Sequence, residues 1–151
     1  MLDAEVRAVS LFFYYASLDE RKAYELSQAA VTRIDDLLRK NPKANIQQTT
    51  VQECTHLWFA YSKRKETRNR QQSRPAIGWK VPPGEAFNQW QQFYKKAPPE
   101  EILAVIFFGI LKFKIADIAK GTGVSEGTIR LRLTHAFKRL GELSNVRTLH
   151  A

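Results

Sequence analysis

The sequence predicts an all-α protein made of two small helical domains joined by a linker, with a helix-turn-helix in the C-terminal domain. Apolar residues recur at three-to-four spacing along most of the chain, and no stretch shows the alternation of a β-strand. A cluster of Pro, Gly and Gln residues separates two such regions. The expected units are a helical domain over 1–70, a linker over 71–84 and a helix-turn-helix domain over 85–151.

The first 40 residues predict two amphipathic helices. The first covers 3–16, and Ser17 with Glu20 three residues later has the form of a capping box. The second covers 19–40 and is stopped by Pro42. The apolar stripes of the two helices are Val6, Val9, Phe12, Phe13 and Ala16, then Ala23, Leu26, Ala30, Ile34, Leu37 and Leu38.

Polar residues over 41–50 predict a loop, and a third helix is expected over 51–70 with Trp58 buried. Six of the 24 basic residues of the chain fall within 63–74. This run is either a solvated helix face or a patch that contacts phosphates, and charge alone does not separate the two.

Two more helices are expected after the linker, over 85–95 and 99–111. A proline at position 99 suits the first turn of a helix, where a missing N–H costs little. The helix over 99–111 is apolar on nearly every side, which indicates a buried central helix. The neighbouring acids Glu100 and Glu101 point apart on a helix and are interpreted as surface residues.

The segment 114–140 has the pattern of a helix-turn-helix. A short helix over 115–120 is followed by a glycine turn over 121–123, since glycine tolerates a left-handed backbone. Ser125 is the expected N-cap of the second helix. The inward stripe of that helix is Ile129, Leu133, Ala136 with Phe137, and Leu140.

The outward face of the second helix has the residues that a DNA-reading helix needs. Arg130 could bind guanine through two hydrogen bonds, and Glu126 could accept one from cytosine. The residues expected near the bases are Glu126, Gly127, Arg130, Leu131 and Thr134. Those better placed for phosphates are Ser125, Thr128, Arg132, Lys138 and Arg139.

These residues resemble a known family. The run GVSEGTIRLRLTHAFKRL is similar to the DNA-binding end of bacterial RNA polymerase sigma factors of the extracytoplasmic-function group. The preceding run APPEEILAVIFFGILKFKIADIAKGTG extends the likeness, so that 85–143 resembles the domain that reads the −35 promoter element. The resemblance implies duplex promoter DNA and the RNA polymerase core as partners, with an anti-sigma-type inhibitor protein as a further partner to consider.

The N-terminal half resembles the same family more weakly. The stretch from Asp19 to Gln28 is similar to the helix with which these proteins bind polymerase, and Glu25 and Gln28 fall on its binding positions. Ala29 replaces an acid of the family pattern. The motif that reads the −10 element is not recognisable around Trp58. Promoter melting is therefore not implied, whereas −35-type binding is.

Composition and the absence of certain motifs argue against several other classes of function. The net charge of +9 indicates a polyanionic partner, and the single Cys54 excludes an internal disulfide. The three histidines are dispersed, and neither a phosphate-binding loop nor a catalytic set is recognisable. We expect no enzyme, metal, cofactor or small-molecule substrate. The longest apolar run, over 102–111, is about half a membrane span, so we expect a cytoplasmic protein that does not bind membranes.

Three hypotheses follow. The first is a sigma factor that binds core polymerase and reads promoter DNA. The second is a sigma-like regulator or adaptor that binds polymerase, DNA or a protein inhibitor and does not initiate transcription by itself. The third is a helical protein-binding module whose basic surface is only solvated.

Overall fold

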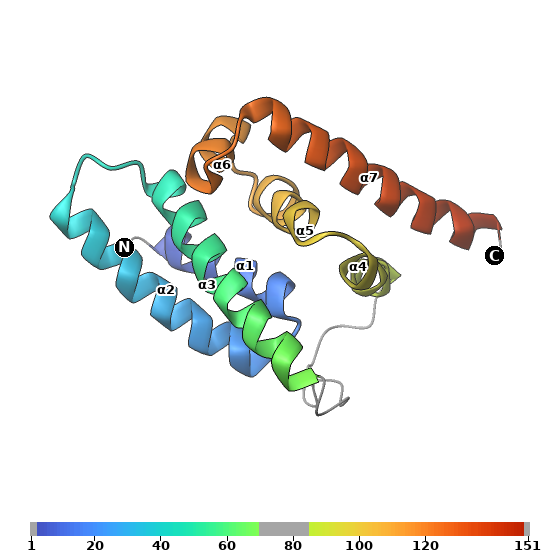
Figure 1. Ribbon diagram of the computed structural model, residues 1–151, viewed down its shortest axis with the longest axis horizontal. Coiled ribbons are helices and arrows are strands. Elements are labelled where there is room, and N and C mark those ends of the chain that lie inside the picture. The colour runs from blue at the N-terminus through green and yellow to red at the C-terminus, as the bar shows by residue number, and fades with distance from the viewer. Residues whose placement is uncertain (1–2, 70–84, 150–151) are drawn as a thin grey trace.

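The computed structural model describes residues 3–69 and 85–149 and has helices throughout these ranges, with no strand among them (Figure 1). The all-α prediction is confirmed. The predicted linker over 71–84 lies outside the described residues, so the division of the chain into two domains stays a prediction. The elements are α1 (Asp3–Ser17), α2 (Glu20–Lys40), α3 (Ile46–Asn69), α4 (Glu85–Lys96), α5 (Pro99–Val105), the π-helix η1 (Ile106–Ile110), α6 (Ile115–Thr122) and α7 (Glu126–Leu149).

Helices α1, α2 and α3 pack against one another as an N-terminal bundle. The buried face of α1 is formed by Val9, Phe12, Phe13 and Ala16, as the spacing predicts, but Val6 of the predicted stripe is 36% exposed. The buried face of α2 consists mostly of small residues, namely Ala23, Ser27, Ala30 and Ile34. Leu37 of the predicted stripe is exposed, because it lies near the end of α2 that is far from the turn to α1. Small side chains let α2 approach α1 closely, and Val51, Cys54 and Trp58 of α3 complete the core of the bundle.

Two helix starts differ from the sequence prediction. Asp19 is the N-cap of α2, where its carboxylate accepts a hydrogen bond from the Lys22 N–H at 3.1 Å. The hydroxyl of Ser17 instead donates to the carbonyl of Phe13, so the predicted capping box is wrong. Helix α3 begins at Ile46, not at Val51, because the Asn45 side chain accepts from the Gln48 N–H at 3.0 Å and caps an extra turn.

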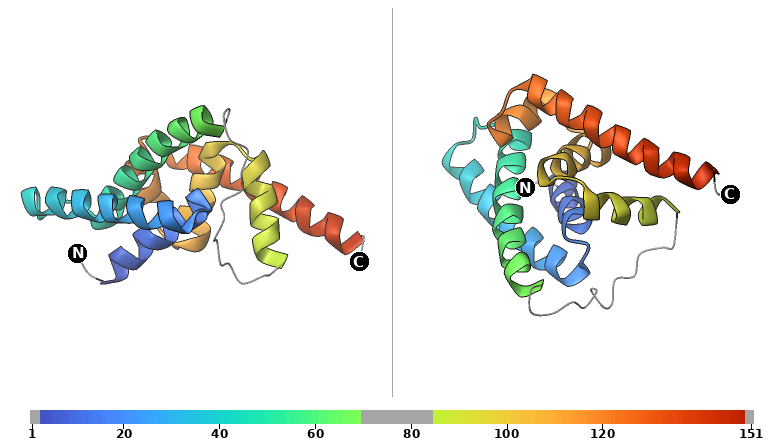
Figure 2. Two further views of the ribbon diagram at one scale, coloured as in Figure 1. Left: turned by 90° about the horizontal axis from the view of Figure 1, so that it is seen from below. Right: turned by 45° about the vertical axis from the view of Figure 1, so that its right-hand side comes forward.

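Helices α4 to α7 form the C-terminal half, in which α5 is the central buried helix. Pro98 lies in the extended region before the first turn, and Pro99 occupies the first helical position, as predicted. The predicted helix over 99–111 changes at Ile106 into the π-helix η1. Helix α7 packs on α4, α5 and α6, and its far end extends beyond the rest of the molecule (Figure 2).

The helix-turn-helix consists of α6 and the start of α7, as predicted. Gly123 ends α6 with φ +77°, a left-handed conformation that glycine adopts without steric cost. Ser125 caps α7, because its hydroxyl oxygen accepts from the Thr128 N–H at 3.1 Å. Gly121, by contrast, lies within α6, next to α3 rather than in the turn.

The two halves of the chain are in contact along a broad surface. The last carbonyls of α1 have no partner within their own helix, and they accept hydrogen bonds from aromatic side chains of α3 and α4. Trp58 Nε1 and Tyr94 Oη both donate to the carbonyl of Ala16, at 2.9 and 2.6 Å. Trp90 Nε1 donates to the carbonyl of Tyr15 at 3.1 Å. The end of α1 therefore holds α4 in place.

A second contact between the halves lies in the apolar core. The ring of Phe12 in α1 stacks on that of Phe107 in η1, with centroids 4.8 Å apart. Near the start of α3, Gln48 Nε2 donates to the Asp117 carboxylate of α6 at 3.0 Å. Helix α6 lies beside this end of α3. The N-terminal bundle and the helix-turn-helix thus share one packed core.

Candidate nucleic-acid interface

The first turns of α7 present a polar face to solvent and an apolar face to the core. Ile129, Leu133 and Ala136 are buried, and Ile129 is only 1% exposed. The opposite face of α7 is exposed to solvent. All five residues that the sequence assigns to base contacts are exposed, namely Glu126, Gly127, Arg130, Leu131 and Thr134. This arrangement is the one in which a recognition helix enters a major groove.

The N-terminus of α7 is capped by its own side chains. The hydroxyls of Ser125 and Thr128 lie 2.9 Å apart, and the Thr128 N–H bonds to Ser125. Further along, the Thr134 hydroxyl donates to the carbonyl of Arg130 at 2.9 Å. The exposed N-terminus of a helix carries partial positive charge, which favours a phosphate there.

The three basic residues that the sequence assigns to phosphates differ in their surroundings. Lys138 is exposed. The Arg139 side chain, about half exposed, donates from Nε to the buried carboxylate of Glu101 at 3.1 Å. Arg132 is partly buried and faces the junction of α3, α5 and α7. Lys138 is therefore the most accessible of the three basic residues.

The buried Glu101 corrects one interpretation. The sequence indicates that Glu101 lies on the surface, but the residue is only 6% exposed and is paired with Arg139. Burial of a carboxylate is tolerated where a cation compensates its charge. Phe137, taken as inward, is 45% exposed and contacts Phe108 edge to face. Spacing along the sequence predicts neither the burial of Glu101 nor the exposure of Phe137, because both depend on how α5 and η1 cross α7.

The two polymerase-contact candidates lie on the exposed face of α2. Glu25 forms ion pairs with Arg21 at 3.5 Å and with Lys22 at 3.2 Å. Gln28 Nε2 donates to the hydroxyl of Tyr24 at 2.7 Å. Tyr24 is 66% exposed, which makes it the most exposed large hydrophobic residue among those described. Sequence reasoning did not single it out, although exposed tyrosines are frequent anchors of protein interfaces.

Residues 3–69 and 85–149 hold no second kind of site that composition would suggest. There, no three His, Cys, Asp or Glu side chains gather as a metal site would require. Cys54 is fully buried, and burial raises the pKa of its thiol, with Glu53 adding to the effect, so the thiol stays protonated. No described helix is both long and apolar enough to span a bilayer.

Comparison with known proteins identifies the fold. The sigma factor RpoE from Bartonella quintana, solved in complex with the anti-sigma factor NepR, superposes with a TM-score of 0.69 at 20% sequence identity. The match covers 94% of this chain and 92% of that chain, so it spans both halves. The chain has the fold of an extracytoplasmic-function sigma factor. No protein-family model matches the chain, and neither does any curated protein.

Proposed function

We propose that this protein is a sigma-factor-like transcription initiation protein that binds the RNA polymerase core and reads −35-type promoter DNA. The observation that carries the proposal is the exposed Arg130 face of α7, within a helix-turn-helix on a fold shared with a sigma factor. Glu25 and Gln28 on α2 are the proposed polymerase contacts. A protein with this function is not an enzyme and works in the bacterial cytoplasm.

The direct test is run-off transcription with purified core polymerase from the native host. Promoter fragments selected by binding to the polymerase complex serve as templates. Specific transcripts that depend on the added protein support initiation. If the protein binds core polymerase and yields no transcript from any selected fragment, the initiation proposal fails.

A specific observation favours a second candidate, a sigma-like regulator or adaptor that does not initiate transcription by itself. The start of α3 is occupied by contacts with α6, including the Gln48–Asp117 hydrogen bond. The sigma factor RpoE, whose fold this chain shares, was solved in complex with an anti-sigma factor. A packed form that binds an anti-sigma-type protein is consistent with this role. Binding to polymerase without transcription, together with capture of such an inhibitor, distinguishes it from the first proposal.

We expect Glu25→Lys to weaken binding to core polymerase about tenfold while the melting temperature changes little. Glu25 is exposed, and its ion pairs within α2 each contribute only about 0.3–0.5 kcal/mol, so folding does not depend on it. Asp36→Lys, an equal charge change at an exposed position of α2, is the matched control. Binding would be measured by biolayer interferometry at two salt concentrations. Equal losses for both variants would argue that only net charge matters.

We expect Arg130→Ala to lower affinity for the best duplex about tenfold and to flatten base preference at one position. A guanidinium bound to guanine O6 and N7 supplies about 1–3 kcal/mol of discrimination. Lys138→Ala should instead weaken all duplexes alike and reduce the slope of log K against log salt by about one unit. Fluorescence anisotropy over a set of single-base variants measures both. A uniform loss for Arg130→Ala contradicts base reading by this residue.

A further inference from the structure

Gly127, Arg130, Leu131 and Thr134 lie on one face of α7. They are spaced at i, i+3, i+4 and i+7, which places them on the same side of a helix, and all four are exposed. Leu131 is 57% exposed. A single exposed leucine is ordinary on a protein surface, so exposure alone indicates no function. What distinguishes Leu131 is the set of residues that surrounds it on this face.

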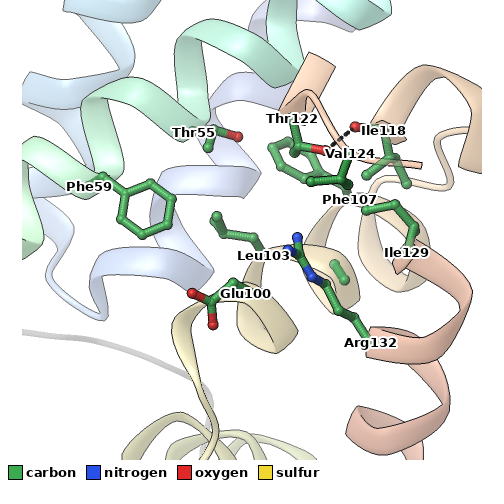
Figure 3. Close-up of a pocket in the computed structure, with 11 residues that line it drawn as sticks. Thr55, Phe59, Glu100, Leu103, Phe107, Ile118, Thr122, Val124, Ile129 and Arg132 are labelled. Atoms are coloured by element: carbon green, nitrogen blue, oxygen red, sulfur yellow. Dashed lines mark hydrogen bonds between the residues drawn. The ribbon is translucent and has the colours of Figure 1, made fainter. Parts of the chain in front are cut away.

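The polar residues next to Leu131 direct their donors elsewhere. Figure 3 shows the Arg132 side chain extending from α7 toward Leu103, at a cavity of about 150 Å³ where α3 meets α5, α6 and α7. Arg132 is therefore turned toward the rest of the protein. The Thr134 hydroxyl donates its proton to the carbonyl of Arg130 at 2.9 Å. Around Leu131 this face thus presents carbon atoms rather than hydrogen-bond donors.

Gly127 leaves an open space beside Leu131. A leucine side chain on a helix leans toward the N-terminus, so Leu131 extends over the turn that contains Gly127. Among the described residues, a Cβ at position 127 would meet only the Ser125 hydroxyl oxygen, at an ordinary contact distance of 3.8 Å. The fold therefore does not require a glycine here, although glycine lowers the stability of a helix. The missing side chain instead lets another molecule approach the backbone closely.

The charge of this face suits duplex DNA as that molecule. Arg130 lies beside Leu131, and the exposed Lys138 lies one turn beyond Thr134. Base edges in the major groove present hydrogen-bond donors and acceptors, and thymine alone adds an apolar group, its C5-methyl. A patch of carbon on a helix that reads the major groove therefore matches thymine.

We propose that Leu131, beside the open space at Gly127, reads a thymine of the promoter through its C5-methyl group. The inference rests on the proposed reading of DNA by α7 and adds a second base to it. Arg130 binds guanine through hydrogen bonds, whereas Leu131 contacts thymine by burying apolar surface. Because the two contacts differ in chemistry, they can be separated by experiment.

The test replaces single thymines by deoxyuridine in the duplex that binds best. Uracil pairs with adenine as thymine does and lacks only the C5-methyl group, so base pairing is unchanged. The full chain and its complex with core polymerase are both titrated with these duplexes by fluorescence anisotropy. Burial of one methyl group corresponds to about a fourfold change in affinity. We expect one substitution to weaken binding by that factor.

Four variants locate the contact. Leu131→Ala should bind the thymine and uracil duplexes equally, whereas Arg130→Ala should keep the wild-type ratio between them. Gly127→Ala fills the open space and should also lose the preference for thymine, while its melting temperature does not fall because alanine favours a helix. Gly141→Ala is the matched control, the same substitution in α7 at a position where a Cβ meets nothing within 4 Å. It should keep the thymine preference.

The outcomes separate this inference from the proposed function. A thymine methyl that matters to the wild type and to Arg130→Ala, but not to Leu131→Ala, supports the inference. Equal sensitivity to uracil in the wild type and Leu131→Ala, or none in the wild type, overturns it. An unchanged thymine preference in Gly127→Ala overturns it as well. Specific binding that still depends on Arg130 would then leave the proposed function intact, whereas absence of binding to any duplex contradicts both.

Discussion

Replacing Phe107 by alanine is expected to lower the free energy of unfolding by about 4 kcal/mol, near the upper end for loss of a buried phenylalanine. Phe107 is fully buried, stacks on Phe12 of α1 and lies 6.2 Å from the ring of Phe113. It also forms part of the wall of the 150 Å³ cavity. Removal of the Phe107 ring would enlarge this cavity, and the loss in free energy of unfolding grows with the volume left empty.

Urea denaturation followed by circular dichroism measures this loss. Phe137→Ala is the control, because Phe137 is 45% exposed and its truncation should cost under about 1 kcal/mol. If the two variants lose similar stability, Phe107 does not connect the halves in the way that the Phe12 stack indicates. A biphasic curve for Phe107→Ala would show that the N-terminal bundle stays folded after the C-terminal half unfolds.

Gly121→Ala is expected to destabilise the protein by about 2 kcal/mol, although alanine is normally the better residue within a helix. The change should gain about 1 kcal/mol from helix propensity. A Cβ at position 121 would, however, lie 2.6 Å from the side chain of Val51 and 2.8 Å from the carbonyl oxygen of Gln48. Backbone cannot move aside as a flexible side chain can, so α6 must shift away from α3.

Gly141→Ala is expected to raise the free energy of unfolding in the same experiment. Gly141 lies within α7, and a Cβ there meets nothing within 4 Å, so the variant should gain about 0.5–1 kcal/mol. Hydrogen exchange of the amides of α3 and α6 would show whether Gly121→Ala loosens that contact in particular. A gain in stability for both variants would mean that α6 and α3 do not approach this closely in solution.

The local parts of the fold could be predicted from the sequence. Capping by Ser125, the left-handed Gly123 and the buried stripe from Ile129 to Ala136 depend on residues within a few positions of one another. The start of α3 at Ile46 was missed, because Asn45 follows a polar loop and no apolar period begins until later. A cap side chain can begin a helix where periodicity gives no signal.

Contacts between distant segments were not predictable in the same way. The sequence predicts that Gly121 belongs to a turn. Its lack of a side chain is needed for another reason, because Val51 of α3 comes too close for any Cβ at position 121. Glu101 was interpreted as a surface acid, since nothing near it in sequence indicates that Arg139 would pair with it. Both positions are decided by helix crossings, which residue spacing along a single helix does not encode.

The sequence predicts which residues of the candidate interface are exposed. It does not predict which of the basic residues there are occupied by contacts within the protein. The five residues assigned to bases are exposed because they lie opposite a buried stripe that periodicity reveals. Arg132 and Arg139 carry the charge that phosphates require, but one faces the cavity and the other binds Glu101. Binding of DNA and of polymerase by the residues named for them stays a prediction, which the variants described above test.

The stack between Phe12 and Phe107 also bears on how the protein is made. The two residues lie almost a hundred positions apart in the chain, so a ribosome that adds roughly 5–20 residues per second separates their appearance by about 5–20 s. During that interval the aromatic face of α1 has α2 and α3 as partners but not η1 or α4. The nascent chain therefore carries an incompletely covered hydrophobic surface, which is the kind of surface that chaperones recognise, until α4 and η1 have been synthesised.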